Sequence, residues 1–179
     1  MTMKHRLIGL TGTNGAGKGE CAAYLKSRGY APFSLSDILR EELEARRMEI
    51  TRDNLIRVGN ELREAFGSDV LARRTAARIE GPAVIDSIRN TREVEYFRTQ
   101  PGFILLALDA PIEIRYQRAV ARGRNESALN INDFRKKEEQ ELQGGDKAQQ
   151  LAACMALADR LIVNDGTLEE LHKKLEDLL

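Results

Sequence analysis

The sequence contains few residues of the kinds that mark secreted or membrane proteins. It has two cysteines, Cys21 and Cys154, no tryptophan and 5% aromatic residues. Two cysteines are too few for a disulfide framework, and the N-terminal segment has no apolar run of signal-peptide length. The longest apolar candidate, FILLALDA, reaches a charge at Asp109 and is far shorter than the roughly 20 residues that span a bilayer. We therefore expect a reduced, cytoplasmic protein without a membrane segment.

The sequence also lacks an excess of charge of either sign. Its 28 basic residues balance 28 acidic residues, so the chain has no global positive field that would draw it onto nucleic acid. The two histidines, His5 and His172, lie near opposite ends of the chain with no third ligand at metal spacing, so neither indicates a zinc site. We expect a small-molecule ligand, no nucleic acid partner, and a monomer or homodimer.

What the sequence does contain is an alternation of short apolar runs and helical segments. With 179 residues, of which 42% are hydrophobic, the chain has the size of one domain that spans residues 1–179. The apolar runs are short and nearly continuous, as is typical of strands buried on both faces of a parallel sheet. The expected strands are 6–11, 31–35, 83–86, 103–108 and 160–163. We predict an α/β fold with three layers around a central parallel sheet of about five strands.

Two segments are too long to be simple connections between strands. One is the polar, helical stretch 36–80, and the other is the charged stretch 123–150. Loops of this length in compact domains are usually functional. We interpret the first as an acceptor-binding insertion and the second as a short helical lid. In the insertion, the expected helix N-caps are Ser36 or Asp37, Thr51 or Asp53, and Ser68 or Asp69.

The stretch GLTGTNGAGKGE at 9–20 predicts a phosphate-binding loop. Gly12, Gly17 and Lys18 match the first seven positions of GxxxxGK[ST], between an apolar strand and a helix, as the motif requires. Glycines let the backbone approach phosphate and turn its N–H groups inward, while the lysine neutralises the outer phosphates. The candidate nucleotide contacts are Gly12, Thr13, Asn14, Gly15, Ala16, Gly17, Lys18, Gly19 and Glu20. The loop predicts a P-loop NTPase fold that binds ATP with Mg²⁺.

The end of the loop departs from the motif. Many such loops have a serine or threonine after the lysine that holds Mg²⁺ directly, whereas this chain has Gly19 followed by Glu20. The dipole of the following helix favours a carboxylate in its first turn, but a triphosphate would repel it. Glu20 therefore either points away from the phosphates or reaches the metal through water.

An arginine stripe is expected along the helix that follows Pro111. Arg115, Arg118 and Arg122 share one side of this helix, beside an apolar stripe. The apolar stripe consists of Ile112, Tyr116, Ala119 and Val120. Three like charges on one stripe repel each other unless an anion lies among them. Phosphoryl transfer needs clustered positive groups around the moving phosphate, so the stripe favours a phosphotransferase.

The motifs together resemble those of nucleoside monophosphate kinases. Over essentially its whole length the chain is similar to a largely archaeal group of small P-loop proteins related to adenylate kinase and dephospho-coenzyme A kinase. The segments that carry the resemblance are GxxGxGKGE at 12–20, SDILREE at 36–42, IDSIRNTREVEYFR at 85–98 and LIVNDGTLEE at 161–170. In nucleoside monophosphate kinases a threonine is usual at the position of Glu20, so this chain departs from that pattern there.

The resemblance implies a role for several residues. Ser36, Asp37 and Arg40 would bind the acceptor, together with Arg89. The catalytic residues would be Lys18, Arg89, Arg118 and Arg122, with the last two at the hinge of the lid. Asp86 would hold Mg²⁺ through water, and Asn164 and Gly166 would lie near the donor base. Simpler interpretations stay open, because Asp37 could be only an N-cap and Arg89 only an exposed turn residue.

These features predict an ATP-dependent kinase of the nucleoside monophosphate type, which moves the γ-phosphoryl group of Mg-ATP to a nucleotide acceptor. Two alternatives stay open. A hydroxyl acceptor, as in dephospho-coenzyme A, would benefit from a carboxylate base such as Asp37. A loop without the usual hydroxyl could also bind nucleotide with little turnover, as a regulatory module.

Overall fold

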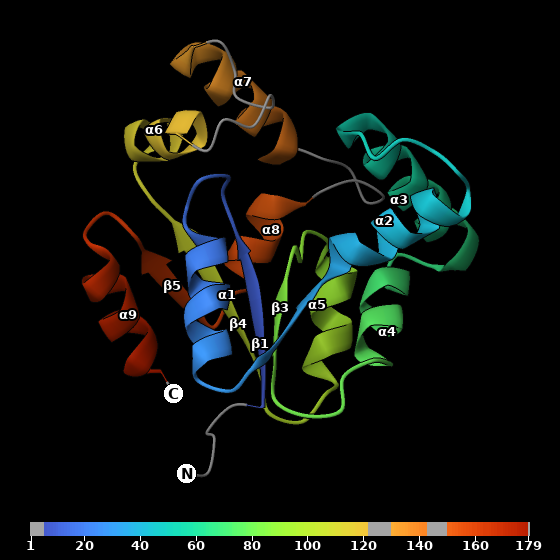
Figure 1. Ribbon diagram of the computed structural model, residues 1–179, viewed down its shortest axis with the longest axis horizontal. Helices are drawn as coiled ribbons and strands as arrows, with labels where there is room; N and C mark the ends of the chain where they lie inside the picture. Colours follow the sequence, from blue (N-terminus) through green and yellow to red (C-terminus); the bar gives the residue numbers. More distant parts are fainter. Residues whose placement is uncertain (1–5, 122–129, 143–149, 179) are drawn as a thin grey trace.

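The computed structural model describes residues 6–121, 130–142 and 150–178 (Figure 1). Its centre is a sheet of parallel strands in the order β2-β3-β1-β4-β5. The strands are β1 (Leu7–Gly12), β2 (Ala31–Ser34), β3 (Ala83–Asp86), β4 (Phe103–Asp109) and β5 (Arg160–Val163). The predicted α/β fold with a central parallel sheet is confirmed. Because β1 lies between β3 and β4, the loop that follows it emerges at the middle of the sheet.

Alternate side chains of the strands enter two different cores. Ile8 and Leu10 of β1 join one core with side chains of α1 (Lys18–Ser27) and α9 (Leu168–Glu176). Leu7 of the same strand joins the other core, on the opposite face of the sheet. This alternation follows from the two-residue period of a strand. The central strands β3, β1 and β4 are therefore buried on both faces, which explains why their sequences are nearly continuously apolar, whereas the edge strands β2 and β5 are largely exposed.

The second face of the sheet is covered by α4 (Val70–Ala76), α5 (Thr91–Arg98) and α8 (Leu151–Ala156). The insertion after β2 forms α2 (Leu35–Ala45) and α3 (Arg52–Phe66) before α4, and it packs into the same core. The helices α6 (Ile112–Ala121) and α7 (Ile131–Leu142) lie above the carboxyl ends of the strands (Figure 1). Among the described residues, no helix combines the length and apolar character that crossing a bilayer requires.

One helix N-cap and one helix face differ from those predicted from the sequence. Helix α2 is capped by Ser34 and not by Ser36 or Asp37, because the strand β2 leads into the helix without a loop. Thr51 caps α3 as expected, with its side chain accepting from the N–H of Asn54, and Asp69 occupies the N-cap position of α4. Val120 is 50% exposed, so it does not belong to the apolar face of α6. That face instead packs Ala119, Ile112 and Tyr116 against Phe134 of α7.

Candidate nucleotide site

The loop between β1 and α1 has a backbone that only glycine adopts easily. Gly12, Gly15 and Gly17 have φ values of 133°, 79° and 104°. A Cβ atom on Gly12 would lie 2.0 Å from the carbonyl oxygen of Leu108, and one on Gly17 would lie 2.3 Å from Nδ2 of Asn164. The glycines of the motif are therefore required by both conformation and space.

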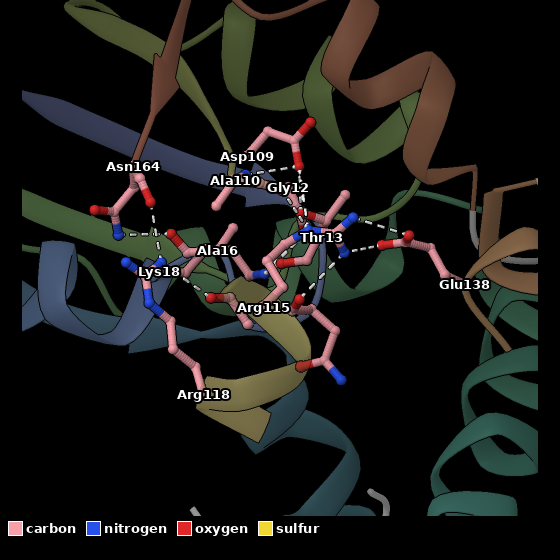
Figure 2. Close-up of polar contacts among 12 residues, drawn as sticks. Gly12, Thr13, Ala16, Lys18, Asp109, Ala110, Arg115, Arg118, Glu138 and Asn164 are labelled. Atoms are coloured by element: carbon pink, nitrogen blue, oxygen red, sulfur yellow. Dashed lines mark hydrogen bonds and ion pairs between the residues drawn. The ribbon is translucent and has the colours of Figure 1, made fainter. Parts of the chain in front are cut away.

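Side chains hold five consecutive carbonyl groups of this loop (Figure 2). Lys18 Nζ donates to the carbonyls of Gly12 (2.7 Å) and Thr13 (2.9 Å), Arg115 Nη1 to Asn14 (3.4 Å), Arg118 Nη1 to Gly15 (3.5 Å), and Asn164 Nδ2 to Ala16 (2.9 Å). A trans peptide unit points its C=O and N–H in opposite directions. Fixing these carbonyls also fixes the direction of the loop N–H groups, which are the groups that bind phosphate.

Asp109 supports the loop from the end of β4. Its Oδ1 accepts from the hydroxyl of Thr13 (2.7 Å) and from the N–H of Ala110 (2.9 Å). Arg115 Nε lies 3.6 Å from the same oxygen and donates to the carbonyl of Ala110 (2.6 Å). Arg115 was expected only as a member of the arginine stripe, and no role was predicted for Asp109. The signal in the sequence was that β4 ends on a carboxylate, Asp109, just as β3 ends on Asp86, on the two sides of β1.

A hollow of about 330 Å³ opens beside the loop. It is lined by Gly17, Glu20, Arg118, Ala121, Asn164, Gly166 and Leu168. Asn164 and Gly166, which the family resemblance associates with the donor base, thus lie at one hollow with Glu20. Arg118 Nη1 donates to the carbonyl of Asn164 (3.1 Å), so its guanidinium lies on this side of the loop. Arg122 lies outside the described residues, as do residues 123–129 and 143–149 of the expected lid.

Asp86 lies half-buried at the carboxyl end of β3, close to the first turns of α1. Burial raises the pKa of the Cys21 thiol to about 12, and the carboxylate of Asp86 is the next largest cause. The N–H of Ser87 donates to Asp86 Oδ1 (2.6 Å). Ser87 has a φ of 67°, which serine rarely adopts.

Arg89 is positioned by its main chain. Its N–H donates to Glu93 Oε2 (3.1 Å), and its carbonyl accepts from the N–H of Gln150 (2.7 Å). Glu93 is fully buried, forms a capping box with Asn90, and pairs with Arg63 of α3 (3.1 Å). The half-buried side chain of Arg89 therefore lies on a turn that is tied to both the insertion and α8.

The other predicted acceptor residues lie on α2. The N–H of Ser36 donates to the capping hydroxyl of Ser34 (3.3 Å). Arg40 Nη1 donates to Asp37 Oδ1 (2.8 Å) in an exposed pair. An exposed ion pair of this kind contributes little to stability. The pair between Asp37 and Arg40 is therefore not needed to hold the fold together.

The described residues contain no cluster of three or more His, Cys, Asp or Glu side chains that could hold a metal ion. Mg²⁺ commonly binds through one or two carboxylates, substrate phosphates and water instead of a protein cage. Asp86 fits that mode, because a half-buried carboxylate at the end of β3 lies beside the phosphate loop. Glu20 is exposed and lines the hollow that also contains Gly166.

Comparisons with known proteins agree with this architecture. The AAA domain family model matches residues 8–143. A UPF0200 protein of Sulfurisphaera tokodaii is 32% identical over 176 residues, covering 97% of this chain and 96% of its own length. A shikimate kinase from Bacteroides thetaiotaomicron has a similar structure, with a TM-score of 0.62 and 16% identity over 96% of this chain and 97% of that one.

A gluconokinase from Sinorhizobium meliloti is also similar, with a TM-score of 0.55 and 14% identity over 97% of this chain and 90% of that one. At such identities these structures establish a likeness of fold alone. The family model, which matches more than half of the chain, and the Sulfurisphaera protein, which is 32% identical over 97% of it, show the family as well as the fold. The chain therefore belongs to the AAA domain family of P-loop proteins and to the UPF0200 proteins.

Proposed function

We propose that this protein is a kinase that transfers the γ-phosphoryl group of Mg-ATP to a small acceptor, with a nucleoside monophosphate as the first candidate. The observation that carries the proposal is the phosphate loop, whose carbonyls are held by Lys18, two arginines and Asn164. Such a loop binds a polyphosphate. The half-buried carboxylate of Asp86 on the neighbouring strand supports the presence of Mg²⁺ at the same edge of the sheet.

The residues divide into a donor side and an acceptor side. On the donor side, Lys18 and the loop N–H groups hold the phosphates, and the hollow with Asn164 and Gly166 takes the nucleoside. On the acceptor side, Arg89 is supplied by the turn after β3, and Ser36, Asp37 and Arg40 by α2. Asp86 would hold Mg²⁺ through water, and the bound ion would neutralise charge on the phosphates. Arg118 adds positive charge beside the loop, and Arg122 is proposed to do the same.

The acceptor is tested by measuring ADP release from Mg-ATP in a coupled assay. The acceptors to compare are the nucleoside monophosphates, dephospho-coenzyme A, shikimate and gluconate. We expect ADP release that depends on a nucleoside monophosphate, with Lys18→Ala reducing turnover by on the order of 10³-fold or more because the outer phosphates lose their neutralising charge. Arg118→Ala should also slow transfer, whereas Arg160→Ala, at an exposed position where β5 begins, should not.

The outcomes separate the function classes. Release of ADP with dephospho-coenzyme A, shikimate or gluconate would move the assignment to a kinase with a hydroxyl acceptor. Tight binding of Mg-ATP without ADP release on any acceptor would favour a nucleotide-responsive regulator. An Arg118→Ala variant with full turnover would remove Arg118 from the catalytic residues.

A further inference from the structure

Arg115 is a buried charge with a defined counterion. Its side chain is 7% exposed, and that of Glu138 in α7 is 13% exposed. The two form a bidentate ion pair, in which Nη2 and Oε2 are 3.0 Å apart and Nη1 contacts Oε1 (Figure 2). Asp109 is a second, more distant partner, 3.6 Å from Nε. A buried charge is costly unless it is paired, so Glu138 is the principal anion that keeps Arg115 in place.

The guanidinium of Arg115 lies beside the part of the loop that Lys18 also holds, and Lys18 is the residue proposed to reach the outer phosphates. Lys18, the residue that reaches those phosphates, donates to the first two carbonyls of the loop, and Arg115 donates to the next one, on Asn14. The backbone of α6 packs directly on the loop as well. A Cβ atom on Gly15 would lie 2.6 Å from the carbonyl oxygen of Arg115. Arg115 and Lys18 thus hold neighbouring carbonyls of one loop.

We propose that Glu138 occupies the position on Arg115 that an outer phosphate of the bound nucleotide takes over. Carboxylate and phosphate both accept two parallel N–H bonds from a guanidinium, so one can replace the other while Arg115 stays in place. Arg115 then stabilises the phosphoryl group that is transferred, and Glu138 is an internal competitor of the nucleotide. This inference rests on the proposed kinase function.

The proposed exchange breaks the ion pair between Arg115 and Glu138, but it does not detach α7 from α6. Phe134 of α7 packs against Tyr116 of α6, with ring centroids 5.8 Å apart, and both belong to one apolar cluster. This cluster can keep α7 on α6 after Glu138 has left Arg115. The ion pair between Arg115 and Glu138 is therefore the contact that phosphate would replace. The apolar contact between α6 and α7 would stay in place.

The test measures the binding of Mg-ATP and of adenosine by calorimetry, in wild type, Glu138→Gln and Glu139→Gln. Removing the competing charge should tighten Mg-ATP binding about tenfold, the value of one charge-assisted hydrogen bond, and leave adenosine binding unchanged. Glu139→Gln is the matched control, because it removes the same charge from an exposed neighbour on α7. In an Arg115→Met background, Glu138→Gln should bring no gain.

Unchanged or weaker Mg-ATP binding by Glu138→Gln would overturn the exchange, and so would an equal gain in Glu139→Gln. If Glu138→Gln does not fold, Glu138→Asp replaces it, since the shorter side chain keeps the charge but cannot form the same pair, and a smaller gain is then expected. Acceptor-dependent ADP release without an effect of Glu138 would leave the kinase standing and remove the exchange. A wild-type protein that does not bind Mg-ATP would remove both proposals.

Discussion

Single residues around the phosphate loop have more than one role each. Asn164 lines the hollow beside the loop and also bonds the loop, and Arg118 does the same from α6. Cys21 lies between these polar groups and the core, on the first turns of α1, and is fully buried. Its neighbours include the charged groups of Lys18 and Asp86, of which the carboxylate disfavours a thiolate.

The thiols give a prediction at this scale. Burial is the largest cause that raises the pKa of both Cys21 and Cys154 from 9.0 to about 12. The thiolate is the reactive form, so the folded protein should not react with a thiol reagent such as dithionitrobenzoate at pH 8, whereas the unfolded protein should react at both thiols. Rapid labelling of the folded protein would contradict the burial of these side chains.

The same shift predicts the direction of a pH effect on stability. Between pH 9 and about 12 the unfolded thiols lose their protons, while the folded thiols keep them. The free energy of unfolding should therefore fall as the pH rises through this window. Urea unfolding of the wild type and of a Cys21→Ala variant, at pH 8 and pH 10.5, measures the share of Cys21 in this loss.

At the scale of elements, the phosphate loop is held between α1, α6 and the end of β5. Each of these elements contributes one or two side chains to the loop carbonyls. The hydrogen bond from Asn164 to Ala16 is the buried one among them. Losing it would leave a buried carbonyl without its donor and would let the loop change shape.

We therefore predict that Asn164→Ala weakens Mg-ATP binding by about tenfold or more, in line with the roughly 1–3 kcal/mol cost of a buried group left without a partner. Asn60→Ala, at an exposed position of α3, is the matched control and should bind Mg-ATP like wild type. Calorimetric titration of both variants measures the difference. Equal affinities in the two variants would show that the loop holds its shape without Asn164.

At the scale of the whole molecule, a buried ion pair connects the insertion to α5, which covers one face of the sheet. Arg63 of α3 and Glu93 of α5 have side chains that are 10% and 0% exposed, and the same carboxylate binds the main chain of Arg89. The pair therefore joins the helices expected to bind the acceptor to the turn that follows β3. Truncating one partner of a buried pair leaves an uncompensated charge, which is much more costly than losing an exposed pair.

Arg63→Met should accordingly lower the free energy of unfolding by about 3–5 kcal/mol. Arg78→Met is the matched control, because its pair with Glu41 is exposed (47% and 52%) and should cost at most about 1 kcal/mol. Urea unfolding measures both. Adding Glu93→Gln to Arg63→Met should recover part of the loss, and two equally mild single variants would be inconsistent with a buried pair.

The local sequence pattern was sufficient to predict the strands of the sheet and the phosphate loop. The apolar runs predicted the five strands of the described sheet to within one residue. For the central strands the reason is that a strand buried on both faces cannot contain polar residues at its centre. The glycines and Lys18 predicted the loop, because its shape depends on residues adjacent in sequence. The predicted cap of α2, Ser36 or Asp37, lies two or three residues after the observed cap, Ser34, because β2 runs directly into that helix.

The sequence by itself thus determined the alternation of strands and helices and the position of the phosphate loop. Only the tertiary structure decided which arginines serve the loop and which anions they face. Asp109 and Thr13 are 96 residues apart in the chain, and Arg115 and Glu138 belong to different helices. Burial and pairing of such groups arise when distant segments pack together, so neither spacing nor composition contains this information.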